Sequence, residues 1–384
     1  MEVVLALYGL PESSERWNTF IVNVLVNGGY SQCPHEPCMF RRSKTGGQGR
    51  VETSVITIHV DDCLHTYRGE RIRSELYAIL KNGKVNEPTV QVLKEAQPIS
   101  HLGVSIRLNE DRSLHLSQPA YVSEILELYP PPKTYSTPCD ENFFHKKPME
   151  GEMSEPVTIH EYLSKLMKIM YLATRTRPDL LPVMSGLSTK MKSPVKADLQ
   201  VLERVVGYIK YTRHFGMHIR VTSMILSVYA DAGHGQHLDL RSHTGIQLYL
   251  GELEFMVLSK SYKQKQVAKS STEAELIAAF ESLDYALKMR AVLHFLQYKQ
   301  VTTIVYQDNT SAITIAYMGR LSSSSNCRYM QIKYNYFKSF LEDKTFAMRY
   351  LPREGMIADY NASPRVGAPF KKMIFHMMGE TFEF

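Results

Sequence analysis

The C-terminal part of the chain carries the feature that most constrains the fold, an ordered succession of strand and helix patterns. From about residue 219 the sequence predicts strand, strand, strand, helix, strand, helix, helix, strand and helix. The strands are expected at 224–230, 245–250, 254–259, 303–307 and 346–351. Three strands in close succession, followed by strands that alternate with helices, predict an α/β domain with an antiparallel start and βαβ crossovers after it.

Acidic residues stand at or near the ends of these predicted elements. They are Asp231, Glu275, Asp308 and Asp359. Taken singly, each has a structural interpretation, as a turn residue, a helix cap or an exposed side chain. Carboxylates at element ends can also converge in space, and such hard oxygen ligands hold Mg²⁺. Two ions held in this way make a centre that cleaves phosphodiesters.

Glu275 is the most informative of the four acids. Its helix begins with Ser270, and Ser270 with Glu273 forms a capping-box pattern, which gives Glu273 a structural role. Small side chains share the face of Glu275, namely Ala278, Ala279 and Ser282. A face of this kind can pack closely against a sheet, where a carboxylate is costly unless its charge is compensated. A bound metal ion would compensate it.

The preceding part of the chain shows three further patterns. Residues 1–128 alternate between helical and strand patterns, with helices expected at 17–26 and 71–80 and a hairpin formed by 102–108 and 113–116. They include a buried strand, 55–60, that ends at Asp61 and Asp62. Residues 129–155 are rich in proline and lack periodicity, which predicts an extended loop or linker. Residues 156–213 are predicted to be helical, with a helix break at 174–179 because Pro178 restricts Arg177. The third helix of this range carries an apolar stripe of Leu199, Leu202, Val205, Val206 and Ile209. The α/β pattern begins at about 219. A chain of 384 residues is expected to contain more than one domain.

Composition narrows the class of protein. The formal net charge of +6 is compatible with nucleic-acid binding without being diagnostic of it. The five cysteines form no CxxC pair, which favours reduced thiols in an intracellular protein. No apolar run approaches the ~18 residues of a membrane span, and no signal peptide is recognisable at the N-terminus. We therefore expect an intracellular protein without membrane contact, in the cytoplasm or the nucleus.

Residues 225–363 resemble the ribonuclease H domain of copia-type LTR retrotransposons. The matching segments are VYADAGHG, RSHTGIQLYLGE, LSKSYKQKQVAKSSTEAELIAA, VYQDNTSAI, IKYNYF and IADYNASP. The resemblance implies that two Mg²⁺ ions, or Mn²⁺ as a substitute, are held by Asp231, Glu275, Asp308 and Asp359. It implies endonucleolytic hydrolysis of the RNA strand of an RNA–DNA hybrid. Asp231 would bridge both ions, Glu275 and Asp308 would complete one ligand shell, and Asp359 the other.

The resemblance continues upstream, where LALYGLPESSERWN, CPHEPCMF, ITIHVDDCLHTY and HLGVSIRL are similar to the reverse transcriptase palm of the same elements. It implies that Asp61 and Asp62 are the residual polymerase pair. The third carboxylate of the family lies upstream of LALYGL, so we expect no reverse transcriptase activity from this chain by itself. The implied fold is multidomain α/β and α+β. It has a partial palm at 1–128, a linker at 129–155, a helical thumb or connection at 156–218, and a ribonuclease H-like mixed five-stranded sheet with helices at 219–384.

Four lysines lie close together before the Glu275 helix, Lys260, Lys263, Lys265 and Lys269. They are either a solvated turn or phosphate contacts to the hybrid. Two segments depart from the family pattern. The run Arg328–Gln331 (RYMQ) replaces the usual Lys-His-Ile-Asp, and the usual Thr-Lys after the last aspartate is absent.

Three hypotheses follow from these observations. The first is a ribonuclease H acting on RNA–DNA hybrids, with other parts of a retroelement polyprotein as further partners. The alternative is a non-catalytic nucleic-acid-binding remnant of such a polyprotein. The third is a decayed fragment with no stable fold.

Overall fold

The computed structural model describes residues 11–46, 49–85, 89–95, 97–145, 151, 155–318 and 328–382. The LALYGL segment and the side chains of the Arg328–Gln331 run, on which sequence expectations rested, lie outside the described part. The chain divides into two compact units, residues 1–92 with 288–299, and residues 93–287 with 300–384. Within the described residues, no helix has the length and apolar character that crossing a bilayer requires.

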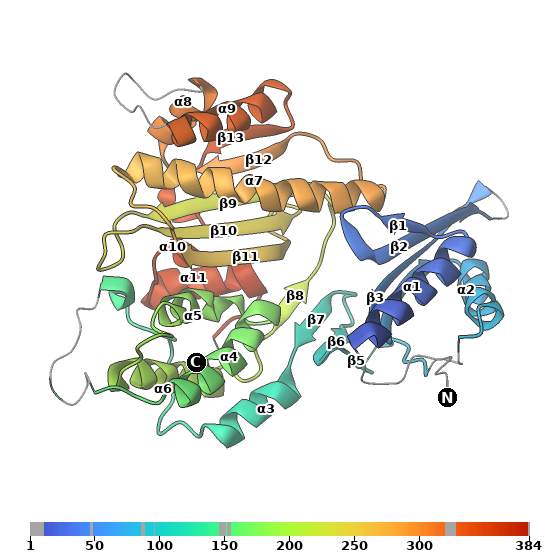
Figure 1. Ribbon diagram of the computed structural model, residues 1–384, viewed down its shortest axis with the longest axis horizontal. Coiled ribbons are helices and arrows are strands. Elements are labelled where there is room, and N and C mark those ends of the chain that lie inside the picture. Colours follow the sequence, from blue (N-terminus) through green and yellow to red (C-terminus); the bar gives the residue numbers. More distant parts are fainter. Residues whose placement is uncertain are drawn as a thin grey trace. The chain divides into compact units, whose positions relative to one another are not determined.

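The first unit is a four-stranded antiparallel sheet in the order β1-β2-β3-β4 (Figure 1). Its elements are α1 (Pro11–Asn27), β1 (Ser31–Cys33), β2 (Glu36–Thr45), β3 (Val51–His59), β4 (Asp62–Arg68) and α2 (Glu70–Asn82). Both helices cover one face, since Leu25 of α1 and Leu76 of α2 share a core with Phe40 and Ile56. The two helices and the strand at 55–60 were predicted. The longest strand, β2, was not predicted.

The second unit is built on a mixed five-stranded sheet in the order β11-β10-β9-β12-β13 (Figure 1). The strands are β9 (Leu226–Gly233), β10 (His243–Leu250), β11 (Phe255–Lys263), β12 (Thr303–Gln307) and β13 (Phe346–Tyr350). The first three pair antiparallel, β12 pairs parallel with β9, and β13 pairs parallel with β12. This confirms the predicted antiparallel start with βαβ crossovers and the ribonuclease H-like mixed sheet.

Helices cover both faces of the central strands. Every residue of β10 is buried, whereas a strand with one solvent face would alternate between buried and exposed residues. The helices of this part are α7 (Ser271–Phe295), α8 (Thr310–Met318), α9 (Arg328–Glu342), α10 (Asp359–Ala362) and α11 (Gly367–Met378). The short helix α10 packs on β9, β10 and β11, which places its first residue, Asp359, against the sheet.

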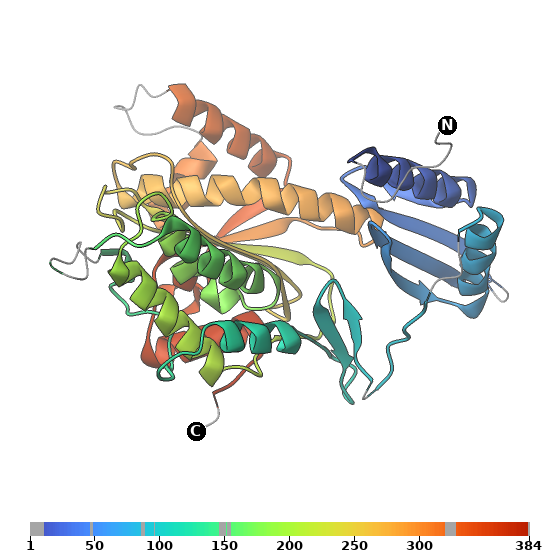
Figure 2. The ribbon, with the colours of Figure 1, turned by 60° about the horizontal axis from the view of Figure 1, so that its bottom comes forward.

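A helical layer precedes the sheet in sequence, with α3 (Pro119–Leu128), α4 (Ile159–Arg175), α5 (Leu181–Ser188) and α6 (Lys196–Tyr211). Figures 1 and 2 show the green helices α4 to α6 beside the red helix α11. They share one core, in which Leu166, Leu202, Val206, Phe370 and Ile374 are buried. The apolar stripe predicted on α6 is confirmed. Leu199 is partly buried and packs against this core, and the other members have no exposed surface, namely Leu202, Val205, Val206 and Ile209.

A second small sheet joins distant parts of this unit. Its antiparallel order is β5-β6-β7-β8, with β5 (Ile99–His101), β6 (Val104–Leu108), β7 (Leu114–Ser117) and β8 (Met217–Ile219). The predicted hairpin corresponds to β6 and β7. Helices α4, α5 and α6 lie within the range 156–213 that was predicted to be helical, and β8 follows them and pairs with β7.

A candidate carboxylate centre

Asp231 lies inside a strand. We expected it at the strand end, but β9 continues to Gly233 because β10 pairs with it throughout, and Gly245 stands opposite Asp231. A Cβ atom at Gly245 would lie 2.4 Å from the carbonyl oxygen of Ala358 and 2.7 Å from the amide nitrogen of Ala362. The missing side chain therefore lets α10 approach β10 closely. This approach brings Asp359, at the start of α10, to the neighbourhood of Asp231.

Glu275 lies in the first turns of α7 and is 7% exposed. Half of the predicted capping box is present, since the Glu273 N–H donates to Ser270 Oγ over 3.2 Å. The Glu273 carboxylate accepts the Lys269 N–H at 2.8 Å instead of that of Ser270. The neighbouring small residues Ala278, Ala279 and Ser282 are fully buried, as expected of a closely packed face. The helix start thus holds Glu275 against the sheet.

Gln307, the last residue of β12, positions the Glu275 side chain. Its Nε2 donates to Glu275 Oε2 over 3.2 Å and to the Ala230 carbonyl over 3.3 Å. Its Oε1 accepts the N–H groups of Asp308 and Asn309 at 2.8 and 3.2 Å. Gln307 is fully buried, and its amide links three of the elements that carry the site. Sequence reasoning did not assign a role to it.

Asp308 follows β12, as predicted, but does not cap the next helix. Asn309 does so, because its Oδ1 accepts the Ala312 N–H at 3.0 Å in the first turn of α8. The structural interpretation of Asp308 as a cap is therefore wrong. Its half-buried carboxylate faces the other acids instead.

Three of the four predicted acids come together. Carboxylate oxygens of Asp231, Glu275 and Asp308 all lie within 4.8 Å of one another. Asp359 is not part of this group. Its two oxygens accept hydrogen bonds from Arg365 Nε and Nη2, both at 2.6 Å, and Arg353 Nη2 lies 3.5 Å away. The fourth acid thus lies beside the cluster with its charge paired to arginine.

Burial and like charge dominate the electrostatics of the cluster. Burial raises the pKa of Asp231 well above its usual range, and the charges of Asp359 and Asp308 raise it further. The pKa of Glu275 is raised in the same way, by burial and then by Asp231 and Asp308. Burial also raises the pKa of Asp308, while Arg353 opposes the rise. Buried carboxylates in mutual contact are stabilised by a cation, and their all-oxygen donor set suits a hard divalent ion.

Asp61 and Asp62 form a different kind of site. His59 pairs with Asp62, so Val60 and Asp61 make the tight turn between β3 and β4. Val60 adopts a φ of 55°, which is uncommon for a β-branched residue, and Trp17 Nε1 donates to its carbonyl over 2.6 Å. Both aspartates are exposed. Among the residues described, neither belongs to a close group of potential metal ligands.

The four lysines do not form one loop. Lys260 and Lys263 belong to β11, which extends beyond its predicted end at 259. Lys263 Nζ pairs with Asp239 Oδ2 at 2.7 Å, and Lys260 Nζ lies 5.5 Å from the centre of the Tyr285 ring. Lys265 and Lys269 follow the strand and are exposed. Two of the four therefore remain accessible to a phosphate backbone.

The residues that replace the usual Thr-Lys after Asp359 anchor α10. Asn361 is fully buried and donates from Nδ2 to Ser259 Oγ over 2.7 Å and to the Lys260 carbonyl over 2.9 Å. Its Oδ1 accepts Gln247 Nε2 at 2.6 Å. The Tyr360 hydroxyl donates to the Asp179 carbonyl over 2.5 Å. No periodicity in the sequence signals these contacts, because they join segments far apart in the chain.

No family model matches the chain. The Pol polyprotein of transposon TNT 1-94 of Nicotiana tabacum is 26% identical over 353 residues, 88% of this chain and 25% of that protein. The Pol polyprotein of transposon RE1 of Arabidopsis thaliana is 24% identical over 365 residues, 94% of this chain and 24% of that protein. The chain thus spans about a quarter of the length of these relatives. A solved foamy viral protease-reverse transcriptase in complex with dsDNA is similar at 14% identity and a TM-score of 0.48, over 90% of this chain and 60% of that one.

Proposed function

We propose that the chain is part of a Pol polyprotein of a copia-type retrotransposon, like the relatives to which it is similar, and that it hydrolyses the RNA strand of RNA–DNA hybrids at the Asp231, Glu275 and Asp308 centre. One observation carries the proposal. Three carboxylates from β9, α7 and the end of β12 converge within 4.8 Å, and burial together with mutual repulsion raises their pKa values. A fold gains no stability from such a group unless something positive joins it.

The donor set fits Mg²⁺, with Mn²⁺ as a substitute, because every ligand is a carboxylate oxygen. Asp231, Glu275 and Asp308 would hold one ion. A second would share Asp231 with Asp359, and its binding requires Arg365 to release the Asp359 carboxylate. Such ions, when bound, would supply an activated water molecule and would neutralise the charge that develops on the phosphate.

The residues around the cluster have distinct tasks in this proposal. Gln307 fixes the Glu275 carboxylate, so that its oxygen stays directed at the cluster without a bound ion. Arg353 is 67% exposed in its side chain and lies next to Asp359, where it can contact a substrate phosphate. The exposed Lys265 and Lys269 would contact the backbone of the hybrid independently of sequence. The RNA strand would be distinguished by its 2′-hydroxyl groups.

We assign hydrolysis and not polymerisation to this chain. Nucleotidyl transfer also uses metal ions held by several carboxylates. Asp61 and Asp62 are exposed at a hairpin turn and, within the described residues, no third acid joins them. The carboxylate grouping needed for metal-assisted chemistry is therefore found at Asp231 and its neighbours.

A second function, hybrid binding without turnover, is favoured by one observation. Two short hydrogen bonds from Arg365 occupy both oxygens of Asp359. If this pair persists when substrate binds, Asp359 cannot serve as a ligand. The protein would then bind nucleic acid through its basic side chains with a strong dependence on salt.

Cleavage of a hybrid with a labelled RNA strand tests the proposal. We expect RNA cleavage that requires Mg²⁺ or Mn²⁺, and a loss of more than about 100-fold in Asp308→Asn, since loss of an outer-shell partner alone costs up to that much. Asp284→Asn is the matched control, because Asp284 is an exposed acid on α7. Salt-dependent binding without cleavage by the folded wild type would establish the second function. Equal cleavage by Asp308→Asn would refute the assignment of the site.

A further inference from the structure

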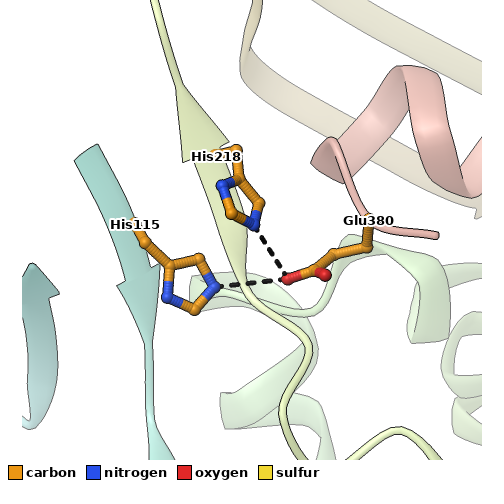
Figure 3. A group of neighbouring side chains, drawn as sticks. All are labelled: His115, His218 and Glu380. Atoms are coloured by element: carbon orange, nitrogen blue, oxygen red, sulfur yellow. Dashed lines mark hydrogen bonds and ion pairs between the residues drawn. The ribbon is translucent and has the colours of Figure 1, made fainter. Parts of the chain in front are cut away.

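A second group of potential metal ligands lies on the small sheet. It differs from the carboxylate cluster in its residue types and in the segments that carry its residues. His115 of β7 and His218 of β8 are direct partners across the two strands. Glu380 reaches them from the segment after α11, 265 residues from His115 in sequence. Figure 3 shows both imidazole rings directing Nε2 at the Glu380 carboxylate. These ligand atoms all lie within 4.8 Å of one another.

The separations within this group match those of a coordinated ion. Glu380 Oε1 is 3.2 Å from His115 Nε2 and 3.3 Å from His218 Nε2. In tetrahedral coordination with bonds of about 2.0–2.1 Å, two ligand atoms lie about 3.4 Å apart. The three side chains therefore need little movement to enclose an ion. Binding would leave each neutral ring with its proton on Nδ1 and its Nε2 lone pair on the metal.

Two glycines allow the backbone to approach the histidines. A Cβ atom at Gly216 would lie 2.5 Å from His115 Nε2 and 2.4 Å from the Leu116 carbonyl oxygen. Gly379 ends α11 with a φ of 73° and turns the chain so that Glu380 follows directly. A Cβ atom at Gly379 would lie 2.8 Å from His218 Cβ. Any other residue at either position would displace a ligand.

The carboxylate is oriented by a backbone donor. The Gly216 N–H donates to Glu380 Oε1 over 2.9 Å, as an outer-shell partner does for a metal-binding carboxylate. The group therefore offers one fixed carboxylate oxygen and two imidazole nitrogens.

The site is closed on one side and open on the other. His115 and Glu380 are buried, whereas the His218 side chain is 36% exposed. His218 and Gly379 also line a cavity of about 190 Å³. His115 and Glu380 do not line this cavity, so it reaches the group only from the side of His218.

We propose that His115, His218 and Glu380 form a binding site for a transition-metal ion of the Zn²⁺ type. Two imidazole nitrogens and one carboxylate oxygen are a ligand set that suits Zn²⁺ and disfavours Mg²⁺. The ion would bridge β7, β8 and the segment after α11. It would thus fasten residues near the C-terminus to a hairpin more than two hundred residues away. This proposal does not depend on hydrolysis at the carboxylate cluster.

Zinc binding by the chelator-treated full chain tests the site. Isothermal titration with Zn²⁺ is carried out in excess Mg²⁺, so that Mg²⁺ competes at the carboxylate cluster. We expect one Zn²⁺ per chain, a raised Tm, and X-ray absorption that reports two imidazole ligands. His218→Gln should weaken binding by more than about 100-fold, given that outer-shell changes alone cost 10–100-fold. The half-exposed position of His218 makes this variant suitable, because little packing is lost.

Two controls separate this site from other binding. His160→Gln removes an exposed histidine of α4 and should leave Zn²⁺ affinity unchanged. Asp308→Asn should also retain the zinc site, which keeps this result independent of the proposed nuclease centre. The proposal is overturned if the wild type binds no Zn²⁺, if His218→Gln binds it equally well, or if Asp308→Asn abolishes binding.

Discussion

Two groups of buried charged side chains in the second unit differ in whether their charges are balanced within the group. Arg177 and Asp179 have no exposed surface, yet each is fully partnered. Arg177 Nε donates to Asp179 Oδ1 over 3.0 Å and Nη2 to Oδ2 over 2.8 Å. Thr212 and Tyr208 complete the network, with Arg177 Nη1 donating to the Thr212 carbonyl and the Tyr208 hydroxyl donating to Asp179. Opposite charges cancel within this group.

The carboxylate cluster lacks that cancellation. Asp231 and Glu275 are 5% and 7% exposed, and after burial the charges of neighbouring acids contribute most to the rise of their pKa values. Burial alone would lower the pKa of Arg177, but Asp179 raises it, so the guanidinium stays charged. In the cluster, burial and like charge act in the same direction and raise the pKa values. The charges of the first group are balanced within the group, whereas those of the second would be balanced by the cation that we propose.

Breaking the complete group should have the largest effect on stability. Asp179→Asn leaves the Arg177 guanidinium buried without a counter-charge, so we expect a loss of about 3–5 kcal/mol in the free energy of unfolding. Chemical denaturation measures it, and Mg²⁺ should not restore the loss. Asp284→Asn, at an exposed position, should stay within about 0.5 kcal/mol of wild type. A small effect of Asp179→Asn would remove the contrast between the two groups.

The close approach of α10 to β10 is the next feature to disturb. Gly245→Ala places a methyl group 2.4 Å from the Ala358 carbonyl oxygen, so α10 and Asp359 must shift. We expect a loss of about 1–3 kcal/mol, as for other overpacked cores. The rate of hybrid cleavage should fall by more than the decrease in the fraction of folded protein accounts for. Gly235→Ala tests a glycine with a φ of 60° and no close neighbour, and should reduce stability without this effect on cleavage.

The sequence predicted the framework of this site well. The succession of strands and helices along the chain, the antiparallel start and the convergence of Asp231, Glu275 and Asp308 follow from hydrophobic periodicity, from element ends and from the family resemblance. These features depend on local patterns that recur with fixed periods. The buried face of small residues beside Glu275 on α7 could be predicted for the same reason.

Features that arise from tertiary contact could not be predicted. Arg365 lies only six residues after Asp359, but its bidentate contact depends on how α10 is docked. The segment with Arg177 was interpreted as a helix break before Pro178, and nothing local indicated that its side chain lies in a core network with Thr212, 35 residues away. The roles of Gln307 and Asn361 likewise appear only when strands and helices are placed together.

Arg365 offers a way to make the carboxylate cluster more dependent on metal. Arg365→Gln removes both hydrogen bonds to Asp359, so Asp359 adds its full repulsion to Asp231. We expect the metal-free variant to lose on the order of 1 kcal/mol in the free energy of unfolding. Mg²⁺ should raise the Tm of this variant by more than it raises the Tm of wild type. Arg353→Gln, whose arginine is 3.5 Å away and mostly exposed, should have a smaller effect. An unchanged response to Mg²⁺ would show that Arg365 does not compete with a cation.

The pH dependence of stability tests the electrostatics of the carboxylate cluster. The pKa of Asp231 is raised in the folded state, so the folded protein binds more protons than the unfolded one above the ordinary aspartate pKa of about 4. Its contribution to stability is therefore present at acid pH and lost as pH rises. Asp231→Asn does not titrate at this position. In metal-free buffer, the Tm of this variant minus that of wild type should grow from pH 4 to pH 7.

Thermal unfolding of the full chain with and without Mg²⁺ is the most direct test of the carboxylate cluster as a cation site. In metal-free buffer at pH 7, Asp231→Asn should melt above wild type, because one of the mutually repelling charges is gone. Mg²⁺ should raise the Tm of wild type, by an amount that grows with the ratio of its concentration to Kd, and leave that of Asp231→Asn nearly unchanged. A wild type that melts at the same temperature with and without Mg²⁺, or an equal rise in both proteins, would contradict a cation site at Asp231, Glu275 and Asp308.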